Sequence, residues 1–195
     1  MIAATQNKGK LKELRLIAEK YGQTLLSMAD AGLGDLEVEE NGETFAENSF
    51  IKAHTVAVLT GRPCIADDSG LCVDILNGAP GIHSARYSGV HGDDQANRKK
   101  LLEDLKDVPQ EQRTAHFTCC ITRCWPDGKT LVAEGVCPGR IAFEERGEGG
   151  FGYDKIFMPE GLDQSFAELG VDVKNKIGHR ARALARLEEL LEQEA

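Results

Sequence analysis

The chain has 195 residues, a formal net charge of −9 and 41% apolar residues. This is enough for one sizeable core, and no Pro/Gly/Ser-rich linker divides the chain, so we expect a single domain over residues 1–195, with one or two lobes. The acidic balance disfavours partners such as nucleic acid or an anionic membrane. Without a signal peptide or a spanning apolar run, the default is a soluble cytoplasmic protein. The six cysteines show no metal-type spacing, which indicates reduced thiols.

The N-terminal residues predict a strand, a polar loop and a helix. Met1 to Ala4 are apolar, and a helical spacing of apolar residues begins at Leu11. The loop between them reads Thr5-Gln6-Asn7-Lys8-Gly9-Lys10. Backbone N–H groups at such a helix start, with two lysines beside them, suit phosphate oxygens. The spacing of a Walker loop is absent, however, and lysines in a first helical turn are usually only solvated.

The second predicted helix begins at Thr44, because Glu47 three residues later completes a capping box. It ends at Gly61-Arg62-Pro63. We assign Glu47 to the cap. Asn48 and Lys52 lie four residues apart on one helix face, so both side chains could point at one ligand.

An acidic segment, Glu37-Val38-Glu39-Glu40, precedes this helix. Runs of this kind are normally a solvated surface, but this one could supply a metal carboxylate.

The most informative segment is Ala66-Asp67-Asp68-Ser69-Gly70, because two adjacent carboxylates follow the apolar residues Cys64, Ile65 and Ala66. We expect a buried strand that ends at the two acids. A carboxylate there can bind a divalent cation and, if desolvated, can take a proton from water. The alternative is that Asp67 and Asp68 only cap a turn.

The middle of the chain predicts further strands and one helix. Residues 71–76 alternate as in a strand, 77–81 have turn chemistry, and 82–89 form a polar loop. Asp93 and Asp94 can cap a helix that is closed by Pro109. Residues 115–122 alternate between apolar and polar side chains, and the loop from Trp125 to Lys129 predicts a hairpin with residues 130–136. His116, on the polar strand face, is expected at the surface.

Two features near the C-terminus suggest a ligand. Four glycines surround Phe151, so this ring could stack on a base, although composition alone favours a flexible loop in which Phe151 belongs to the core. His179 and Arg180 begin an amphipathic helix, where cations oppose the helix dipole. Their placement therefore needs a reason such as a bound anion.

Taken in chain order, these motifs resemble those of the inosine triphosphate pyrophosphatase family. The resemblance covers essentially the whole chain. It rests on Thr5-Gln6-Asn7-Lys8-Gly9-Lys10, Thr44-Phe45-Ala46-Glu47-Asn48-Ser49-Phe50-Ile51-Lys52-Ala53, Ala66-Asp67-Asp68-Ser69-Gly70-Leu71, Gly78-Ala79-Pro80-Gly81-Ile82-His83-Ser84-Ala85-Arg86-Tyr87, Gly149-Gly150-Phe151-Gly152-Tyr153-Asp154 and His179-Arg180-Ala181.

The resemblance implies an α/β fold in which a mixed twisted sheet with flanking helices forms two lobes around a nucleotide cleft, usually in a homodimer. It implies Mg²⁺-dependent hydrolysis of the non-standard purine nucleotides ITP, dITP and XTP to monophosphate and pyrophosphate, which cleanses the nucleotide pool. By this likeness Asp68 is the general base and a metal ligand, and Glu39 is the second metal carboxylate, with Glu40 as its rival. The residues implied to bind the phosphates are Thr5, Gln6, Asn7, Lys8, Gly9, Lys10 and Lys52, and those implied to line the rest of the nucleotide are Ser69, Phe151, Gly152, Tyr153, Asp154, Lys174, His179 and Arg180.

Elementary chemistry is compatible with these roles. Hydrolysis of a phosphoanhydride requires neutralised phosphate charge and an aligned water, which a cation, lysines and one carboxylate can provide. Like-charge repulsion from Asp67 would raise the pKa of Asp68. Two departures from the family pattern are the short N-terminal strand and Gly178, which stands where the family generally has Ser and could alter one hydrogen bond near the base.

Two rival interpretations come from other classes. One is a Maf-like pyrophosphatase acting on modified pyrimidines, which the Phe151 and His179-Arg180 motifs disfavour. The other is a nucleotide-binding protein without turnover, which the set of Asp68, Lys52 and Glu39 disfavours.

Overall fold

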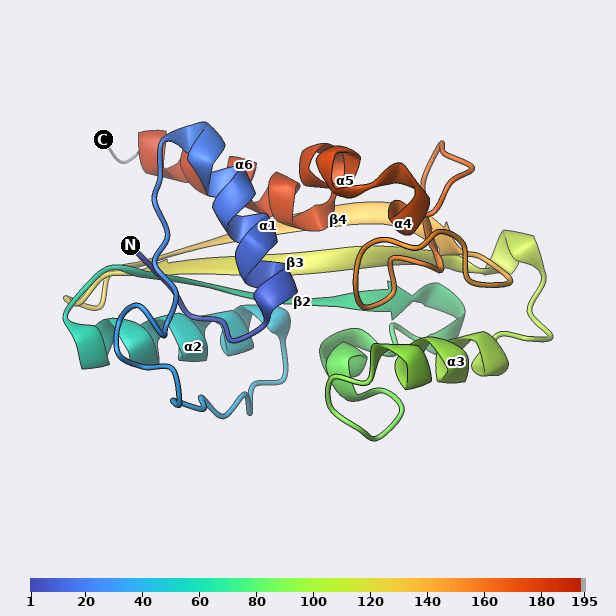
Figure 1. Cartoon of the computed structure of the whole chain (residues 1–195), viewed down its shortest axis with the longest axis horizontal. Helices are drawn as coiled ribbons and strands as arrows, with labels where there is room; N and C mark the ends of the chain where they lie inside the picture. Colours follow the sequence, from blue (N-terminus) through green and yellow to red (C-terminus); the bar gives the residue numbers. More distant parts are fainter. Residues whose placement is uncertain (194–195) are drawn as a thin grey trace. The chain divides into compact units, whose positions relative to one another are not determined.

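The computed structural model describes residues 1–193 as a mixed α/β fold built on one five-stranded sheet (Figure 1). The strand order is β1-β2-β3-β4-β5. β1 pairs in parallel with β2, and β4 pairs antiparallel with β5, so the sheet is mixed, as predicted. The strands are β1 (Ile2–Ala3), β2 (Cys64–Val73), β3 (Thr114–Cys124), β4 (Thr130–Ile141) and β5 (Phe157–Pro159).

The helices are α1 (Lys8–Ala18), α2 (Phe45–Thr60), α3 (Asp94–Asp104), α4 (Phe166–Leu169), α5 (Val171–Ile177) and α6 (His179–Gln193). Short 3₁₀ segments are η1 (Glu19–Tyr21), η2 (Asp74–Leu76), η3 (Gly81–Arg86) and η4 (Gln110–Gln112). Among the described residues, none of these helices has the length and hydropathy needed to span a membrane.

The chain forms two compact units, each assembled from separate stretches of sequence. Unit 1 contains Met1–Asp68, Cys119–Gly135 and the chain from Arg180 onward. Unit 2 contains Ser69–Thr118 and Val136–His179. Strands β2, β3 and β4 contribute residues to both units. The single domain expected from the sequence stays a prediction.

Unit 1 has apolar clusters on both faces of its strands. Helices α1 and α6 cover one face and α2 covers the other (Figure 1). On the first face, Leu14 of α1 and Leu184 of α6 pack with Ile65 of β2. On the second face, Ala53 and Val56 of α2 pack with Cys64 and Ala66, the two neighbours of Ile65 in β2. Because successive strand residues point to opposite faces, neighbouring residues of β2 enter different environments.

Unit 2 has an apolar core in which α3, α4 and β5 pack on residues of β2, β3 and β4. Phe117 of β3 meets Phe157 of β5 edge to face, with ring centroids 4.6 Å apart. Arg113 is fully buried, and its guanidinium donates to the carbonyl oxygens of Leu105, Ile141 and Ala142. A buried charge is tolerated when its donors are satisfied in this way.

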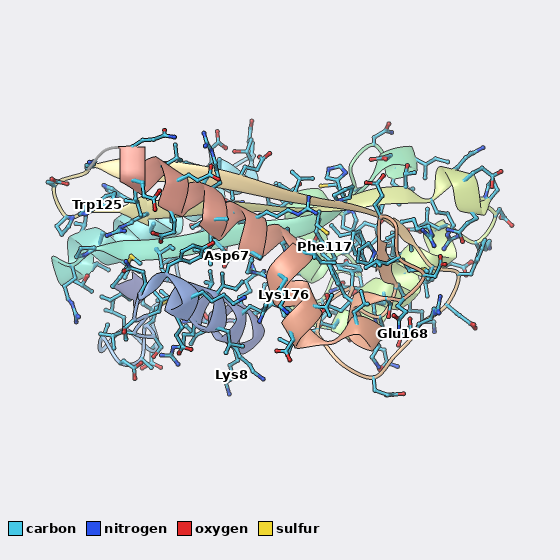
Figure 2. The ribbon with its side chains drawn as sticks, turned by 90° about the horizontal axis from the view of Figure 1, so that it is seen from above. Lys8, Asp67, Phe117, Trp125, Glu168 and Lys176 are labelled. Carbon is cyan, nitrogen blue, oxygen red and sulfur yellow. The ribbon has the colours of Figure 1, made fainter. Side chains whose placement is uncertain are left out.

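Most predicted element starts are confirmed. The Thr44 and Glu47 side chains form the capping box of α2, and Gly61 ends that helix with φ +61°. Asp93 caps α3, because its carboxylate accepts from the N–H of Ala96. The predicted hairpin is also present, with Trp125 at its tip (Figure 2).

Two predictions from the strand patterns were wrong. The strand does not end at the two acids, because β2 continues from Cys64 to Val73. Residues 74–76 form a 3₁₀ turn and not strand. His116 is partly exposed, in line with the expectation for it, although Thr118, Cys120 and Thr122 on the same strand face are buried. Helices cover both faces of this strand, so alternation of polarity does not report exposure here.

Candidate functional site

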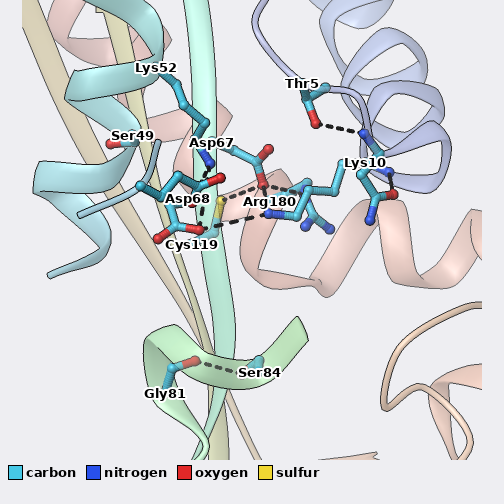
Figure 3. Close-up of polar contacts among 12 residues, drawn as sticks. Thr5, Lys10, Ser49, Lys52, Asp67, Asp68, Gly81, Ser84, Cys119 and Arg180 are labelled. Carbon is cyan, nitrogen blue, oxygen red and sulfur yellow. Dashed lines mark hydrogen bonds and ion pairs between the residues drawn. The ribbon is translucent and has the colours of Figure 1, made fainter. Parts of the chain in front are cut away.

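The central feature of unit 1 is the pair of aspartates inside β2. Asp67 is fully buried and Asp68 is 7% exposed. Burying two adjacent carboxylates is costly unless cations and donors compensate their charge. Figure 3 shows Lys10, Lys52 and Arg180 around them.

Asp67 faces the side of the sheet covered by α1 and α6. Its Oδ2 accepts from Arg180 Nε at 2.9 Å and lies 3.5 Å from Lys10 Nζ. The Sγ of Cys119 lies 4.0 Å from the same oxygen. Arg180 also binds Glu13, a buried residue of α1. The positive charge of Arg180 at the start of α6 is therefore compensated by the carboxylates of Asp67 and Glu13. These two carboxylates explain why an arginine is placed at a helix N-terminus, which the sequence alone did not explain.

Asp68 faces α2. Its Oδ1 lies 3.7 Å from Lys52 Nζ and 4.0 Å from Lys10 Nζ. Lys52 also pairs with Glu40 Oε2 at 3.0 Å. Lys10 is thus close to both aspartates, while Lys52 joins Asp68 to a half-exposed glutamate.

The two adjacent carboxyl groups have pKa values shifted in opposite directions. Burial alone would raise the pKa of Asp67, but the charges of Lys10, Arg180 and Lys52 outweigh it and lower that pKa. For Asp68 burial is the largest effect and raises the pKa above its usual range, with Glu40 and Asp67 adding to the rise and Lys52 and Lys10 opposing it. The predicted repulsion from Asp67 contributes, but burial contributes more. Environments that separate two such pKa values are a signature of acid–base sites.

The loop before α1 is fixed by its own polar side chains. Asn7 is the N-cap of α1, and its Oδ1 accepts from the N–H of Lys10. Gln6 donates to the carbonyl oxygens of Gly34 and Leu36, and Thr5 Oγ1 accepts from the N–H of Asn7. The side chains of Gln6 and Asn7 thus hold the loop, whereas Lys8 is exposed and Lys10 reaches the acids.

Of the two candidate metal carboxylates before α2, Glu40 lies in the cluster. Its contact with Lys52 connects it to Asp68. Glu39 is exposed, and its role stays a prediction. The segment is anchored at Gly42, whose N–H donates to Asn48 Oδ1 at 2.9 Å. Asn48 therefore positions this acidic segment.

The donor set fits Mg²⁺. Mg²⁺ is usually held by one or two carboxylates together with substrate phosphates and waters. Asp68 and Glu40 both lie against Lys52 Nζ, so hard oxygen ligands already surround one cationic position. Glu13, Glu40, Asp67 and Asp68 outnumber the cations Lys10, Lys52 and Arg180 that pair with them. Among the described residues no group of three or more metal-type side chains lies together.

The second group of predicted site residues lies in unit 2, around Phe151. Lys174 Nζ lies 4.3 Å from the centroid of the Phe151 ring and donates to Asp154 Oδ2 at 2.7 Å. The N–H of Phe151 donates to the same carboxylate oxygen. Gly150 has φ +77°, and a Cβ there would lie 2.4 Å from Asp154 Oδ2, so this position requires glycine. Phe151 is thus a partly buried ring in a loop held by hydrogen bonds. It is neither the fully exposed ring expected for base stacking nor the core ring under a flexible loop.

The other predicted residues of unit 2 are placed by the core. The Tyr153 hydroxyl donates to the carbonyl oxygen of Ser84, and Ser69 lies partly exposed in β2. The buried His179 ring stacks on Phe117 with centroids 4.6 Å apart. Gly178 has φ −72°, and a Cβ there would lie 2.6 Å from the carbonyl oxygen of Lys174. A serine at this position would therefore require α5 to shift.

Glu13 is the site residue that sequence reasoning missed. Glutamate in a charged helix usually faces solvent. The available signal was its position four residues before Ile17, on the inward-facing stripe of α1 with Leu14 and Ala18.

Comparisons with known proteins agree with this fold. A profile described as "Ham1 family" matches residues 1–190. The dITP/XTP pyrophosphatase of Bacillus subtilis is 50% identical over 98% of this chain and 96% of its own length, and that of Bacillus licheniformis is 48% identical over 99% and 98%. The structure of the Staphylococcus aureus Ham1 protein matches with a TM-score of 0.86 and 40% identity, covering 100% of this chain and 98% of that one.

A crystal structure described as a nucleoside-triphosphatase and dITP/XTP pyrophosphatase from Mycobacterium abscessus matches with a TM-score of 0.77 and 45% identity over 95% of this chain and 97% of that one. Similarity of this extent in both sequence and fold goes well beyond a shared architecture. The chain therefore belongs to the Ham1 family.

Proposed function

We propose that this chain is a nucleoside triphosphate pyrophosphatase that hydrolyses dITP, XTP and ITP to the monophosphate and pyrophosphate. The observation that carries the proposal is the buried acid pair of β2, with Lys10 and Lys52 within 4.0 Å of Asp68. The named relatives are dITP/XTP pyrophosphatases, and similarity to them extends along nearly the whole chain.

Asp68 is the proposed general base. Its raised pKa makes it a better proton acceptor than an exposed aspartate, and the residue is 7% exposed. The water oxygen bonds to phosphorus, its proton passes to Asp68, and the anhydride bond between the α- and β-phosphates breaks. Asp67 stays ionised and holds Arg180 and Lys10 in place.

The cations of unit 1 are the proposed phosphate ligands. Lys10, Lys52 and the backbone N–H groups at the start of α1 would neutralise the triphosphate, with Thr5 to Gly9 forming the loop. Mg²⁺ bound by Asp68 and by Glu39 or Glu40 would supply Lewis-acid stabilisation of the phosphate charge.

The proposed base-binding residues are Ser69, Phe151, Gly152, Tyr153, Asp154, Lys174 and His179 of unit 2. Arg180, which the family resemblance adds to this set, is held by Asp67 and Glu13 in unit 1, and its contact with the base stays a prediction. A protein donor that faces the 6-oxo group of hypoxanthine or xanthine would form a hydrogen bond with it. The same protein donor would face the 6-amino donor of adenine and stay without an acceptor, which disfavours ATP. The N–H groups of Phe151 and Gly152 already donate to Asp154 and Asp94, so side-chain donors are the better candidates. The expected homodimer and cytoplasmic location stay predictions.

The test is hydrolysis of a panel of triphosphates in Mg²⁺, followed as phosphate released after added inorganic pyrophosphatase. We expect ITP, dITP and XTP to be hydrolysed with higher kcat/KM than GTP or ATP. Equal kcat/KM for ITP and ATP would contradict the proposed selectivity. Preference for a modified pyrimidine would indicate the Maf-like class, and binding without phosphate release would indicate a non-catalytic protein.

The role of Asp68 has its own test. Asp68→Asn should lower kcat by at least ~10²-fold, the lower end of general-base effects, while the protein stays folded. Asp107→Asn is a matched control, because Asp107 is exposed on the other unit. Near-normal turnover by a folded Asp68→Asn variant would remove Asp68 from the mechanism.

A further inference from the structure

The glycine loop that carries Phe151 is held by two side chains of α3. Gly152 follows Phe151, and its N–H donates to Asp94 Oδ2 at 2.7 Å. Its carbonyl oxygen accepts from Arg98 Nη1 at 2.8 Å. Both backbone groups of a single residue are therefore bound by one helix.

The spacing of these side chains explains how one helix can reach both groups. Asp94 and Arg98 are four residues apart, so they lie on the same face of α3, one turn from each other. Asp94 accepts and Arg98 donates, which matches the donor and acceptor of one peptide residue. Gly152 has φ +58°, in the left-handed region that side chains rarely adopt.

The burial of Arg98 shows that this contact is more than a surface bond. Arg98 is 8% exposed, and its Nε donates to Glu145 Oε1 at 2.7 Å. Arginine is rarely buried this deeply unless its donors are satisfied, because desolvation of the guanidinium is costly. The carboxylate of Glu145 and the carbonyl oxygen of Gly152 together satisfy it.

The opposite side of the same loop is fixed by Asp154 and Lys174. Asp154 Oδ2 accepts from the N–H of Phe151, and Lys174 lies over the Phe151 ring. Phe151 thus has a held residue on its C-terminal side and a charged pair against its ring and N–H. A loop rich in glycine would otherwise sample many conformations and would lose entropy when it ordered around a ligand.

We infer that Asp94 and Arg98 are positioning residues for nucleobase recognition, because they fix the backbone at Gly152 and with it the orientation of Phe151. This inference rests on the proposed function, in which Phe151 contacts the base of a purine triphosphate. Neither residue touches the reacting phosphate in this role. Their removal should therefore change the selection of the base more than the chemical step.

The test compares Asp94→Ala and Arg98→Ala with wild type for kcat and KM on dITP and dATP. We expect KM for dITP to rise, and the ratio of kcat/KM for dITP over dATP to fall about three- to tenfold, as for partial loss of one charge-assisted hydrogen bond. The value of kcat on dITP should change by less than about twofold. Asp94→Asn retains an acceptor oxygen and should recover most of the ratio.

Two controls separate this role from general stability. Lys99→Ala removes an exposed cation of the same helix and should leave the ratio unchanged. Glu145→Gln weakens the other partner of Arg98 without altering Gly152. If an alanine variant does not fold, Arg98→Lys keeps the charge but lacks the planar fork, and it should give an intermediate ratio.

Amide hydrogen exchange distinguishes failure of this inference from failure of the proposed function. The N–H of Gly152 should exchange faster in Asp94→Ala than in wild type, whatever the substrate is. A wild-type protein without dITP hydrolysis would overturn the proposed function. An active wild type, with a dITP-over-dATP ratio unchanged in folded Asp94→Ala and Arg98→Ala, would overturn the positioning role.

Discussion

Arg180 and Lys52 both support the acid pair of β2, yet the structure predicts that only Arg180 is essential for stability. The Arg180 side chain is 4% exposed and binds the carboxylates of Asp67 and Glu13, whose side chains are 0% and 7% exposed. Lys52 pairs with Glu40, whose side chain is 37% exposed, and lies 3.7 Å from Asp68, which would keep Lys10 as a second cation in a Lys52→Ala variant. The first network is sealed from water, whereas the second has a solvated partner.

The expected magnitudes follow from this difference. Removing one member of a buried ion pair costs about 3–5 kcal/mol, because the remaining charges lose compensation in a poorly solvated place. For a chain of this size that corresponds to a fall in Tm of roughly 6–20 °C. A pair with a solvated partner contributes up to about 1 kcal/mol, so Lys52→Ala should lower Tm by no more than about 4 °C.

The assay is thermal unfolding of Arg180→Ala and Lys52→Ala, with kcat/KM on dITP measured for each folded protein. Lys52→Ala should lose activity far more than stability, since we propose that its cation binds the phosphates of the substrate. Arg186→Ala is the matched control for Arg180. Arg186 lies in the same helix, and the partner of its ion pair, Glu189, is exposed. An Arg180→Ala protein that melts within about 2 °C of wild type would refute the reasoning, as would a Lys52→Ala protein that melts equally early.

Three further outcomes are expected. Chelation of divalent cations should abolish dITP hydrolysis, and added Mg²⁺ should restore it, while Tm without nucleotide changes little because Lys52 already lies between Asp68 and Glu40. Burial raises the pKa of Cys64 to about 12, so at pH 8 its thiolate should be ~10³-fold scarcer than at the ordinary pKa, and mass-mapped alkylation should find Cys72, which is partly exposed, modified first. Thr44→Ala should cost about 1 kcal/mol of unfolding free energy through loss of the α2 cap, measured by denaturant titration, with activity per folded molecule retained.

Local signals were the part of the fold that the sequence predicted well. The capping box at Thr44, the N-cap at Asp93 and the hairpin loop at Trp125 each depend on a few adjacent residues. Such contacts form within one turn, so their side chains can be identified without knowing what packs above them.

Burial was the part that the sequence predicted poorly. β2 continues through two aspartates because cations from α1, α2 and α6 surround them, and those helices are distant in sequence. The same reason hides Glu13 and Arg113, which look like surface residues until their partners are placed. Composition within a window cannot report a partner 167 residues away, as Arg180 is from Glu13.

The two aspartates show why their distinct roles require the structure. Apart from the family resemblance, which implies Asp68, local sequence does not distinguish Asp67 from Asp68 as the base. Strand geometry sends them to opposite faces, Asp67 toward Arg180 and Asp68 toward Lys52. Burial opposes ionisation of Asp67, but the charges of Lys10 and Arg180 outweigh it and lower the pKa, so Asp67 stays ionised and is a poor proton acceptor. Asp68 has flexible lysines and a half-exposed glutamate as partners, which a phosphate or a cation can displace, and its raised pKa suits proton transfer. The aspartate that we propose as the general base is therefore the one whose partners can exchange with substrate phosphates or a cation, whereas the partners of Asp67 are fixed.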